Sequence, residues 1–421
     1  MTDLNYLVNI SSRKKYASMI RDCFLNTFKE VFKKVKHKDL IILYIKSFKK
    51  NFQDNIVCHL GEVGGSVDAE AYKFSIKIKN KNLLCALKLI PLVHSESSKI
   101  MDLNYKSWKE LYILKMVYNL IKNHNCPNVP IIYLYFVCNN CSNTDYLNPN
   151  IIKYYNNLNI RKSLENNKSK EDILKKMEKK KGFGTSALCI LNELCDSSLK
   201  DIIGCNYIEK INDNMFHSFI FQIISGIYSI HKISNICHFD LHGGNILISN
   251  IESNGYWLYQ INGNDFYIPN YGYILKIWDF GRSMIIKYDD FNDICAQIIH
   301  QAKRFFKDIF KKNPKLEKKI YKNLNIDNIK IILFAFDIWR IISYLYSKFK
   351  KESYYELKFK ITLELLSTIK KDCENNWIHL LIDNNEITNT PELFMNYLLN
   401  KYFSIYVKKK NNLINKNKYI T

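Results

Sequence analysis

The stretch that most restricts how this chain can fold is Ile236 to Leu247, which reads ICHFDLHGGNIL. Its polar residues His238, Asp240 and Asn245 follow the spacing H-x-D-x-x-x-x-N, and an apolar run farther along ends in Asp279-Phe280-Gly281. One aspartate can accept the proton of an acceptor hydroxyl, while an asparagine and a second aspartate can hold two metal ions. This ordered combination predicts a phosphoryl-transfer site, whose main tasks are to neutralise phosphate charge and to align the acceptor.

The composition permits a sizeable core and sets broad limits on partners. The 421 residues are 47% hydrophobic, and 62 basic against 40 acidic residues give a formal net charge of +22. A basic balance suits acidic partners such as nucleic acid, an anionic membrane surface, ATP or an acidic protein, although much of the excess lysine can be solvated surface. Because we find no aromatic-basic nucleic-acid module, nucleic acid is not expected to be the main ligand.

Features of secretion or membrane insertion are not evident. The chain does not start with a basic segment followed by an apolar one, and no apolar run reaches the ~18 residues of a spanning helix. The 12 cysteines form no framework, and Cys138 and Cys141 make a C-x-x-C without a second pair at zinc spacing. We therefore expect reduced thiols, no zinc site and a cytoplasmic protein.

The first part of the chain predicts helices and then strands. Residues 1–55 mix apolar residues at helical spacing with many lysines, which favours a helical, basic N-terminal extension. A glycine-rich stretch from Gly61 to Val67 then precedes a period-2 run, and an apolar strand follows at 83–90. Glycines let backbone N–H groups approach a phosphate closely, but an ordinary hairpin turn explains the same residues equally well.

A lysine inside the apolar strand is the next candidate. The charge of Lys88 is costly there unless a carboxylate pairs with it. Residues 107–121 read as an amphipathic helix in which Glu110 lies beside an apolar stripe, so a Lys88–Glu110 ion pair is expected. A solvated surface glutamate is the alternative.

Two insertions and a tail are expected beyond this helix. Residues 139–181 are rich in Asn, Lys and Glu, which is typical of a charged surface insertion. Residues 251–273 are aromatic with turn signals and predict a β-hairpin, which is either a substrate-facing or partner-facing surface or a packed flap. Residues 407–421 form a basic tail.

The remaining segments are a strand at 186–194, a long amphipathic helix at 214–231 and further helices after Gly281. The end of this strand, which includes Glu193 and leads into Cys195, is expected to be a linker whose backbone groups can bind an adenine edge. The sequence FDIW around Asp337 is expected to open one of the late helices.

With these residues in order, the chain resembles the eukaryotic-type protein kinases over roughly residues 56–348, in particular the divergent serine/threonine kinases of large DNA viruses. The resemblance implies an α+β, bilobal fold, with a β-rich N-lobe at 56–192, a mainly helical C-lobe at 193–406, and MgATP between them. It implies transfer of the γ-phosphoryl group of ATP to Ser or Thr hydroxyls of a protein substrate, in a host cytoplasm or a virion.

The same resemblance assigns roles to individual residues. The implied catalytic residues are Asp240 as base, Lys88 with its partner Glu110, and His242. The implied ATP-binding residues are Gly61, Gly64, Gly65, Val67, Ala86, Lys88, Glu193 and Cys195. The implied Mg2+ ligands are Asn245 and Asp279. In addition, Asp337 would brace the catalytic loop, and His238, Phe280 and Leu114 would stack as an apolar spine.

Some positions depart from the kinase pattern. Leu60 and Glu62 stand where the family has glycines, so the phosphate lid is altered. Phe239 replaces the arginine that reads an activation-loop phosphate, and no A-P-E triplet follows Gly281, so activity without phosphorylation of that loop is expected. His242 replaces a lysine that helps to neutralise the γ-phosphate, which a histidine can do only when protonated.

Two other functions stay open. The pattern H-x-D-x-H-x-x-N, with His242, is similar to small-molecule phosphotransferases that act on aminoglycosides or choline, whereas the D-F-G and FDIW motifs argue against that class. A pseudokinase scaffold would fit the altered lid but not the intact set of charged and amide residues.

Overall fold

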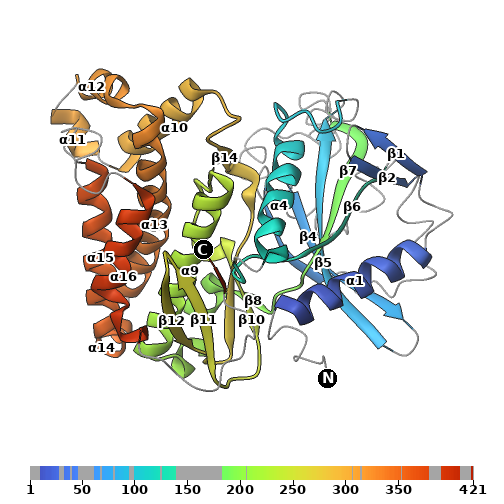
Figure 1. Ribbon diagram of the computed structural model, residues 1–421, viewed down its shortest axis with the longest axis horizontal. Coiled ribbons are helices and arrows are strands. Elements are labelled where there is room, and N and C mark those ends of the chain that lie inside the picture. The colour runs from blue at the N-terminus through green and yellow to red at the C-terminus, as the bar shows by residue number, and fades with distance from the viewer. Residues whose placement is uncertain are drawn as a thin grey trace, which may run out of the picture. The chain divides into compact units, whose positions relative to one another are not determined.

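Strands fill most of the N-terminal half of the described chain and helices most of its C-terminal half, so the protein is α+β as expected (Figure 1). The chain divides into a strand-rich unit, Lys15–Tyr112 and Ile131–Leu194, and a helix-rich unit, Met1–Lys14, Ile113–Pro130 and Cys195–Thr421. The computed structural model describes residues 10–27, 33–37, 40–45, 61–66, 69–78, 81–93, 99–123, 126–138, 183–204, 206–305, 307–312, 315–351, 353–378, 390–407 and 419–420.

One sheet forms the core of the strand-rich unit, in the order β1-β2-β6-β7-β5-β4-β3. Its strands are Lys33–His37 (β1), Leu40–Ile45 (β2), Gly61–Ser66 (β3), Ala69–Ile78 (β4), Lys81–Val93 (β5), Ile132–Cys138 (β6) and Phe183–Asn192 (β7). Within the described strands of this sheet, β2 and β6 pair in parallel and the other neighbours pair antiparallel. Residues 187–192 of β7 are all buried, as expected for a strand with neighbours on both sides.

The structure differs from the helices predicted for residues 1–55. A helix is present at Ile10–Thr27 (α1), but β1 and β2 follow it. The segment of β2 reads LIILYI, a short apolar run whose periodicity does not separate helix from strand. Its isoleucines favour a strand, and backbone pairing with β6 fixes it there.

The helix-rich unit is arranged around a long buried helix, Asp213–Ser234 (α9), which the sequence predicted at 214–231. Asn212 caps its first turn by accepting a hydrogen bond from the Met215 N–H, and Asn235 ends it in the left-handed conformation. The other helices of this part are Leu199–Gly204 (α8), Phe291–Phe305 (α10), Lys307–Lys312 (α11), Leu316–Asn323 (α12), Ile326–Lys350 (α13), Ser353–Lys358 (α14), Lys360–Ile378 (α15) and Pro391–Tyr402 (α16). Figure 1 shows α13, α15 and α16 side by side.

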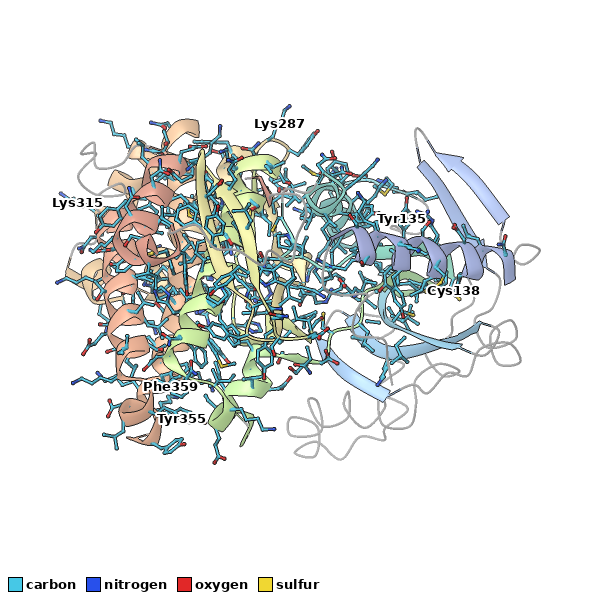
Figure 2. The ribbon with its side chains drawn as sticks, turned by 60° about the horizontal axis from the view of Figure 1, so that its bottom comes forward. Tyr135, Cys138, Lys287, Lys315, Tyr355 and Phe359 are labelled. Atoms are coloured by element: carbon cyan, nitrogen blue, oxygen red, sulfur yellow. The ribbon has the colours of Figure 1, made fainter. Side chains whose placement is uncertain are left out.

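Aromatic side chains tie these helices together at one end. The ring centroid of Phe216 on α9 lies 4.7 Å from that of Phe349 on α13 and 5.2 Å from that of Phe359, which precedes α15. Tyr355 of α14, labelled with Phe359 in Figure 2, donates a hydrogen bond from its hydroxyl to the Ile203 carbonyl at 2.9 Å. Edge-to-face ring pairs of this kind stabilise the packing beyond the effect of the apolar area that they bury.

Short strands complete the helix-rich unit. Ser197–Ser198 (β8), Ile246–Asn250 (β10) and Tyr273–Ile277 (β13) form one sheet, in the order β13-β10-β8. Ile236–Cys237 (β9) pairs with Met284–Ile285 (β14). The helix-only pattern expected after Gly281 therefore misses β14.

The predicted hairpin at 251–273 is present as Tyr256–Ile261 (β11) and Asn264–Pro269 (β12). Its turn residues Asn262 and Gly263 both have positive φ, as a two-residue hairpin turn requires. Tyr419–Ile420 (β15) pairs in parallel with β11. Because Trp257, Tyr259, Phe266 and Ile268 are at most 2% exposed, the hairpin is a packed flap rather than a partner-facing surface.

The charged insertion 139–181 and most of the basic tail 407–421 lie outside the described residues.

The expectation of reduced thiols is wrong at one residue. Cys138, labelled in Figure 2, is disulfide-bonded. None of the helices in the described ranges is long and apolar enough to cross a membrane.

Candidate active site

The loop that carries the H-x-D-x-x-x-x-N pattern, residues 238–245 (the H-x-D loop), is fixed by one buried carboxylate. Asp337 Oδ2 accepts a hydrogen bond from the His238 N–H at 2.7 Å, and Oδ1 accepts one from the Phe239 N–H at 3.0 Å. His231 Nε2, from α9, lies 2.9 Å from Oδ2. Burial alone would raise the pKa of Asp337, but the hydrogen bond and positive field of His231 and the contacts with His238 lower it below its ordinary value.

Asp337 thus makes the contacts that the kinase resemblance implies, although not at the start of a helix. It lies in the interior of α13 and is 1% exposed. The FDIW motif continues an apolar run that begins several residues earlier, so the helix starts at Ile326. His231, Cys237 and Asp337 also have possible metal-binding atoms within 4.8 Å of one another. Both oxygens of Asp337 already accept hydrogen bonds, so we interpret this group as the anchor of the loop.

One residue of this loop and one of the D-F-G segment have a left-handed backbone conformation. Phe239 and Asp279 both have left-handed φ angles, of 61° and 65°. Residues other than glycine adopt this conformation at a cost of about 1–3 kcal/mol, so the surroundings have to impose it. Around Phe239 the Asp337 carboxylate does so, because it holds the N–H groups of two successive residues.

The H-x-D loop and the D-F-G segment are joined by hydrogen bonds. The Trp278 N–H donates to the Asn245 carbonyl at 2.9 Å, which brings Asn245 next to the residue that precedes Asp279. His238 Nε2 lies 2.9 Å from the Trp278 carbonyl, and its ring centroid is 5.0 Å from that of buried Phe280. The predicted contact of His238 with Phe280 is therefore confirmed.

Within the H-x-D loop, Asp240 and Asn245 are held relative to each other. The Asn245 Nδ2 group donates to the Asp240 carbonyl at 2.9 Å, so the amide oxygen of Asn245 is the atom suited to bind a cation. The Asp240 side chain is 21% exposed, and its Oδ2 lies 3.7 Å from Arg282 Nε. A partly exposed carboxylate next to an amide oxygen can orient a hydroxyl and bind metal.

His242 caps the one-turn helix Gly243–Asn245, with its Nδ1 accepting a hydrogen bond from the Gly244 N–H at 3.0 Å. Burial lowers its pKa, and the nearby Arg340 and His238 act in the same direction against Asp240 and Asp279. The folded state therefore favours the neutral form of the ring. A Cβ atom at position 243 would lie 2.6 Å from Cε1 of Tyr344, which explains the glycine there.

The predicted ion pair between Lys88 and Glu110 is present in the strand-rich unit. Lys88 Nζ on β5 lies 2.5 Å from Glu110 Oε1 on the helix Lys106–Lys122 (α4). The two residues are 6% and 4% exposed, which excludes the solvated-glutamate alternative. Removing either partner of a buried pair of this kind destabilises the fold, because the other charge is left buried without its partner.

The glycine-rich stretch is a strand rather than a loop. Gly61, Gly64 and Gly65 lie in β3, which pairs antiparallel with β4 and has an irregularity between Glu62 and Gly64. Gly64 is opposite Ala71, which in turn is opposite Lys88, so these three residues follow one another across adjacent strands. Val67 lies outside the described residues.

The predicted adenine-contacting residues are found at the end of β7 and on β5. Ala86 is half-buried opposite Asn192, and Glu193 is held by its N–H donating to the Ile131 carbonyl at 2.9 Å. The Oδ1 atom of Asn192 is buried and has no hydrogen-bond partner among the described residues. Cys195 belongs to the helix-rich unit.

Sequence reasoning missed Arg282, whose Nε lies 3.7 Å from Asp240 Oδ2, and the charge interactions of Arg340 with Asp240 and with other arginines. Arg340 on α13 has a lowered pKa because of burial and then because of Arg304 and Arg282, while Asp240 acts in the opposite direction. Arg282 follows the D-F-G segment, and Arg304 lies in the last turn of α10. The sequence feature that could have indicated them is the rarity of arginine, since only six of the 62 basic residues of the chain are arginines. Arginine suits carboxylate and phosphate recognition better than lysine does.

Comparisons with known proteins show a distant similarity to viral serine/threonine kinases. The chain is 25% identical over 223 residues to "Probable serine/threonine-protein kinase 380R" of Invertebrate iridescent virus 6, which covers 52% of this chain and 35% of that protein. It is 37% identical over 68 residues to 019R of Frog virus 3, which also bears a serine/threonine-protein kinase name, over 16% of this chain and 8% of that protein. The predicted resemblance to viral kinases is confirmed at this level.

Other viral proteins are similar over comparable lengths. The uncharacterized protein R403 of Acanthamoeba polyphaga mimivirus is 25% identical over 260 residues, 47% of this chain and 33% of that protein. The chain thus matches about a third or less of the length of these three relatives. No protein-family model matches the chain.

Proposed function

We propose that this chain is a serine/threonine protein kinase that transfers the γ-phosphoryl group of MgATP to hydroxyls of protein substrates. The strand-rich unit would be its N-lobe and the helix-rich unit its C-lobe. The observation that carries the proposal is the H-x-D loop, which Asp337 anchors and which a backbone hydrogen bond joins to the D-F-G segment. The similarity to viral proteins that bear kinase names supports it.

The residues present fit Mg2+ and ATP. Asn245 has its amide nitrogen engaged and its oxygen available for a hard cation, and Asp279 adds a carboxylate close by in sequence to the Trp278 amide that Asn245 binds. The unpartnered Asn192 Oδ1 suits an exocyclic amine such as that of adenine. Bound Mg2+ would supply neutralisation of phosphate charge.

Asp240 is assigned the role of orienting the acceptor hydroxyl and accepting its proton. Lys88, held by Glu110, is assigned to the α- and β-phosphates, where the buried ion pair keeps the ammonium in one orientation. Because the folded state favours neutral His242, we assign it to shaping the loop rather than to neutralising the γ-phosphate. The arginines near Asp240 would favour an acidic protein substrate.

The anchoring of the H-x-D loop supports the proposal of activity without activation-loop phosphorylation. Phe239 is 4% exposed, and its N–H donates to the Asp337 carboxylate. This contact orders the loop without an added phosphate.

The test is transfer of labelled γ-phosphate from MgATP to a panel of acidic and neutral proteins, aminoalcohols and aminoglycosides. Asp240→Asn is expected to abolish transfer but retain ATP binding, and Asp265→Asn on the hairpin is the matched control. Label on protein Ser or Thr that disappears in Asp240→Asn supports the proposal. Label only on small alcohols, which the His242 pattern allows, or ATP binding without any transfer, would refute it.

A further inference from the structure

Two segments without a role in the proposed chemistry, helix α1 and the β11–β12 hairpin, meet at one turn. This turn, Cys126–Pro130, is called the Asn128 turn below. Arg13 of α1 is 1% exposed, and its guanidinium donates to the Pro127 carbonyl at 2.7 Å and to the Val129 carbonyl at 2.6 Å. The planar guanidinium therefore fixes the two carbonyls that flank Asn128.

Asn128 itself is bonded to the hairpin and to strand β13. Its Oδ1 accepts a hydrogen bond from the Tyr259 hydroxyl at 2.9 Å. Its Nδ2 donates to the Leu275 carbonyl at 2.9 Å, and its own carbonyl accepts the Ile277 N–H at 2.9 Å. Asn128 is 1% exposed, so it makes these hydrogen bonds to protein groups and not to water. Its orientation is therefore determined by Arg13, Tyr259 and β13 together.

Helix α9 leaves little room for the turn to shift. A Cβ atom at Gly226 would lie 3.1 Å from Asn128 Cβ and 3.0 Å from Ile277 Cδ1, which is closer than ordinary contacts. Gln222, one helical turn earlier, accepts the Leu275 N–H at 3.0 Å and lies 3.3 Å from Asn128 Nδ2. The turn, β13 and α9 therefore form one packed and hydrogen-bonded group.

Strand β13 leads directly into the D-F-G segment. Ile277 is bonded to Asn128, the next residue is bonded to the Asn245 carbonyl, and Asp279 then adopts its left-handed conformation. We propose that Arg13 and Tyr259 are positioning residues that act through the Asn128 turn to hold β13, and so set the position of Asp279 as a metal ligand. The metal-binding part of this inference rests on the proposed function.

A small change at either residue is expected to loosen β13 without removing a ligand. Tyr259→Phe deletes one hydroxyl and leaves the ring in place, whereas Arg13→Lys keeps the charge but replaces a two-pronged donor by an ammonium. Loss of one neutral hydrogen bond is expected to weaken the apparent Mg2+ affinity in the presence of ATP about fivefold. The KM for the protein substrate should change less than this.

The experiment compares Tyr259→Phe, Arg13→Lys and their double variant with wild type. Tyr267→Phe, on the same hairpin and 7% exposed, is the matched control. The first readout is amide hydrogen exchange of the peptide 273–281, which needs no ligand. The second is the Mg2+ concentration dependence of ATP binding and phosphoryl transfer, measured well below the melting temperature of each variant.

Faster exchange in 273–281 and a raised Mg2+ requirement in both single variants, with a double variant that is less than additive, supports the inference. Unchanged exchange in this peptide overturns it. Lower melting temperatures with an unchanged Mg2+ requirement reduce the contacts to a structural role and also overturn it. If wild type binds no MgATP, the proposed function fails, and the exchange data still decide whether Arg13 and Tyr259 hold β13.

Discussion

Replacing Asp337 by Asn tests the anchoring of the H-x-D loop most directly. The carboxylate accepts hydrogen bonds from the His238 and Phe239 N–H groups and lies 2.9 Å from His231 Nε2. Asparagine offers one oxygen, and its NH2 group would face a donor. One buried N–H left unpaired costs about 1–3 kcal/mol, and loss of charge on the remaining acceptor adds about 1 kcal/mol.

The expected destabilisation of Asp337→Asn is therefore about 3 kcal/mol. For a unit of this size, that lowers the melting temperature by about 6–12 °C. The kcat of the protein that stays folded should fall more than the KM for ATP rises, because Asp240 is misplaced while Lys88 is not. The matched control is Asp213→Asn, which also removes a carboxylate that accepts two hydrogen bonds, from Thr362 N and Oγ1.

The pH dependence gives a second check. The folded-state pKa of Asp337 is lowered, so its contribution to stability is complete above the unfolded pKa of about 3.9 and is lost as the pH falls through the folded value. The difference between wild type and Asp337→Asn should be constant from pH 8 to pH 5 and shrink in acid. Equal melting temperatures and equal kcat at pH 7 would refute the anchoring argument.

Three further substitutions have expected outcomes. Lys88→Met should weaken ATP binding, measured by calorimetry, at least tenfold. Because it leaves Glu110 buried without its cation, it should also lower the free energy of unfolding, measured in urea, by about 3–5 kcal/mol. The double variant Lys88→Met with Glu110→Gln should recover stability but not ATP binding. Gly243→Ala should cost about 1–3 kcal/mol through overlap with the Tyr344 ring, and Tyr344→Ala should relieve it, while the lack of such relief would show that the overlap is not the cause. Because burial lowers the pKa of His242, the folded state favours the neutral ring, so stability should fall as the pH drops through about 6.5. His242→Asn, which can still cap the turn, should flatten that fall without moving the activity profile above pH 7, and a kcat that follows His242 protonation would contradict the neutral-ring argument.

Local sequence patterns predicted the parts of the site that depend on neighbours along the chain. The buried cation in the apolar strand anticipated the Lys88–Glu110 pair, because an unpaired charge there is too costly. Spacing alone placed Asp240 and Asn245 in one loop, and the aromatic, turn-bounded segment anticipated the hairpin. In each instance one dominant physical requirement, charge pairing or turn geometry, left few alternatives.

Contacts between distant segments were not predictable in the same way. Arg13 and Pro127 are 114 residues apart, and Asn128 and Leu275 are 147 residues apart. Nothing in the local pattern of α1 indicates that one of its cations is buried, because an amphipathic helix with several basic residues reads the same whether Arg13 is buried or exposed. Strand β2 was assigned to a helix for a related reason, since one of its two pairing partners, β6, lies far along the chain.

The Arg13 contact also bears on biosynthesis and on the choice of recombinant fragments. Arg13 leaves the ribosome long before its two carbonyl acceptors, which lie 114 and 116 residues later. At about 5–20 residues per second, this leaves the guanidinium without them for roughly 6–20 seconds, during which other acidic groups can compete for it. A recombinant fragment trimmed to the kinase-like region, from residue 56, would lack Arg13 altogether and bury two carbonyls without their donor. Such a fragment would also lack α1, β1 and β2, so low yield from it would reflect the missing contacts of the N-terminal segment.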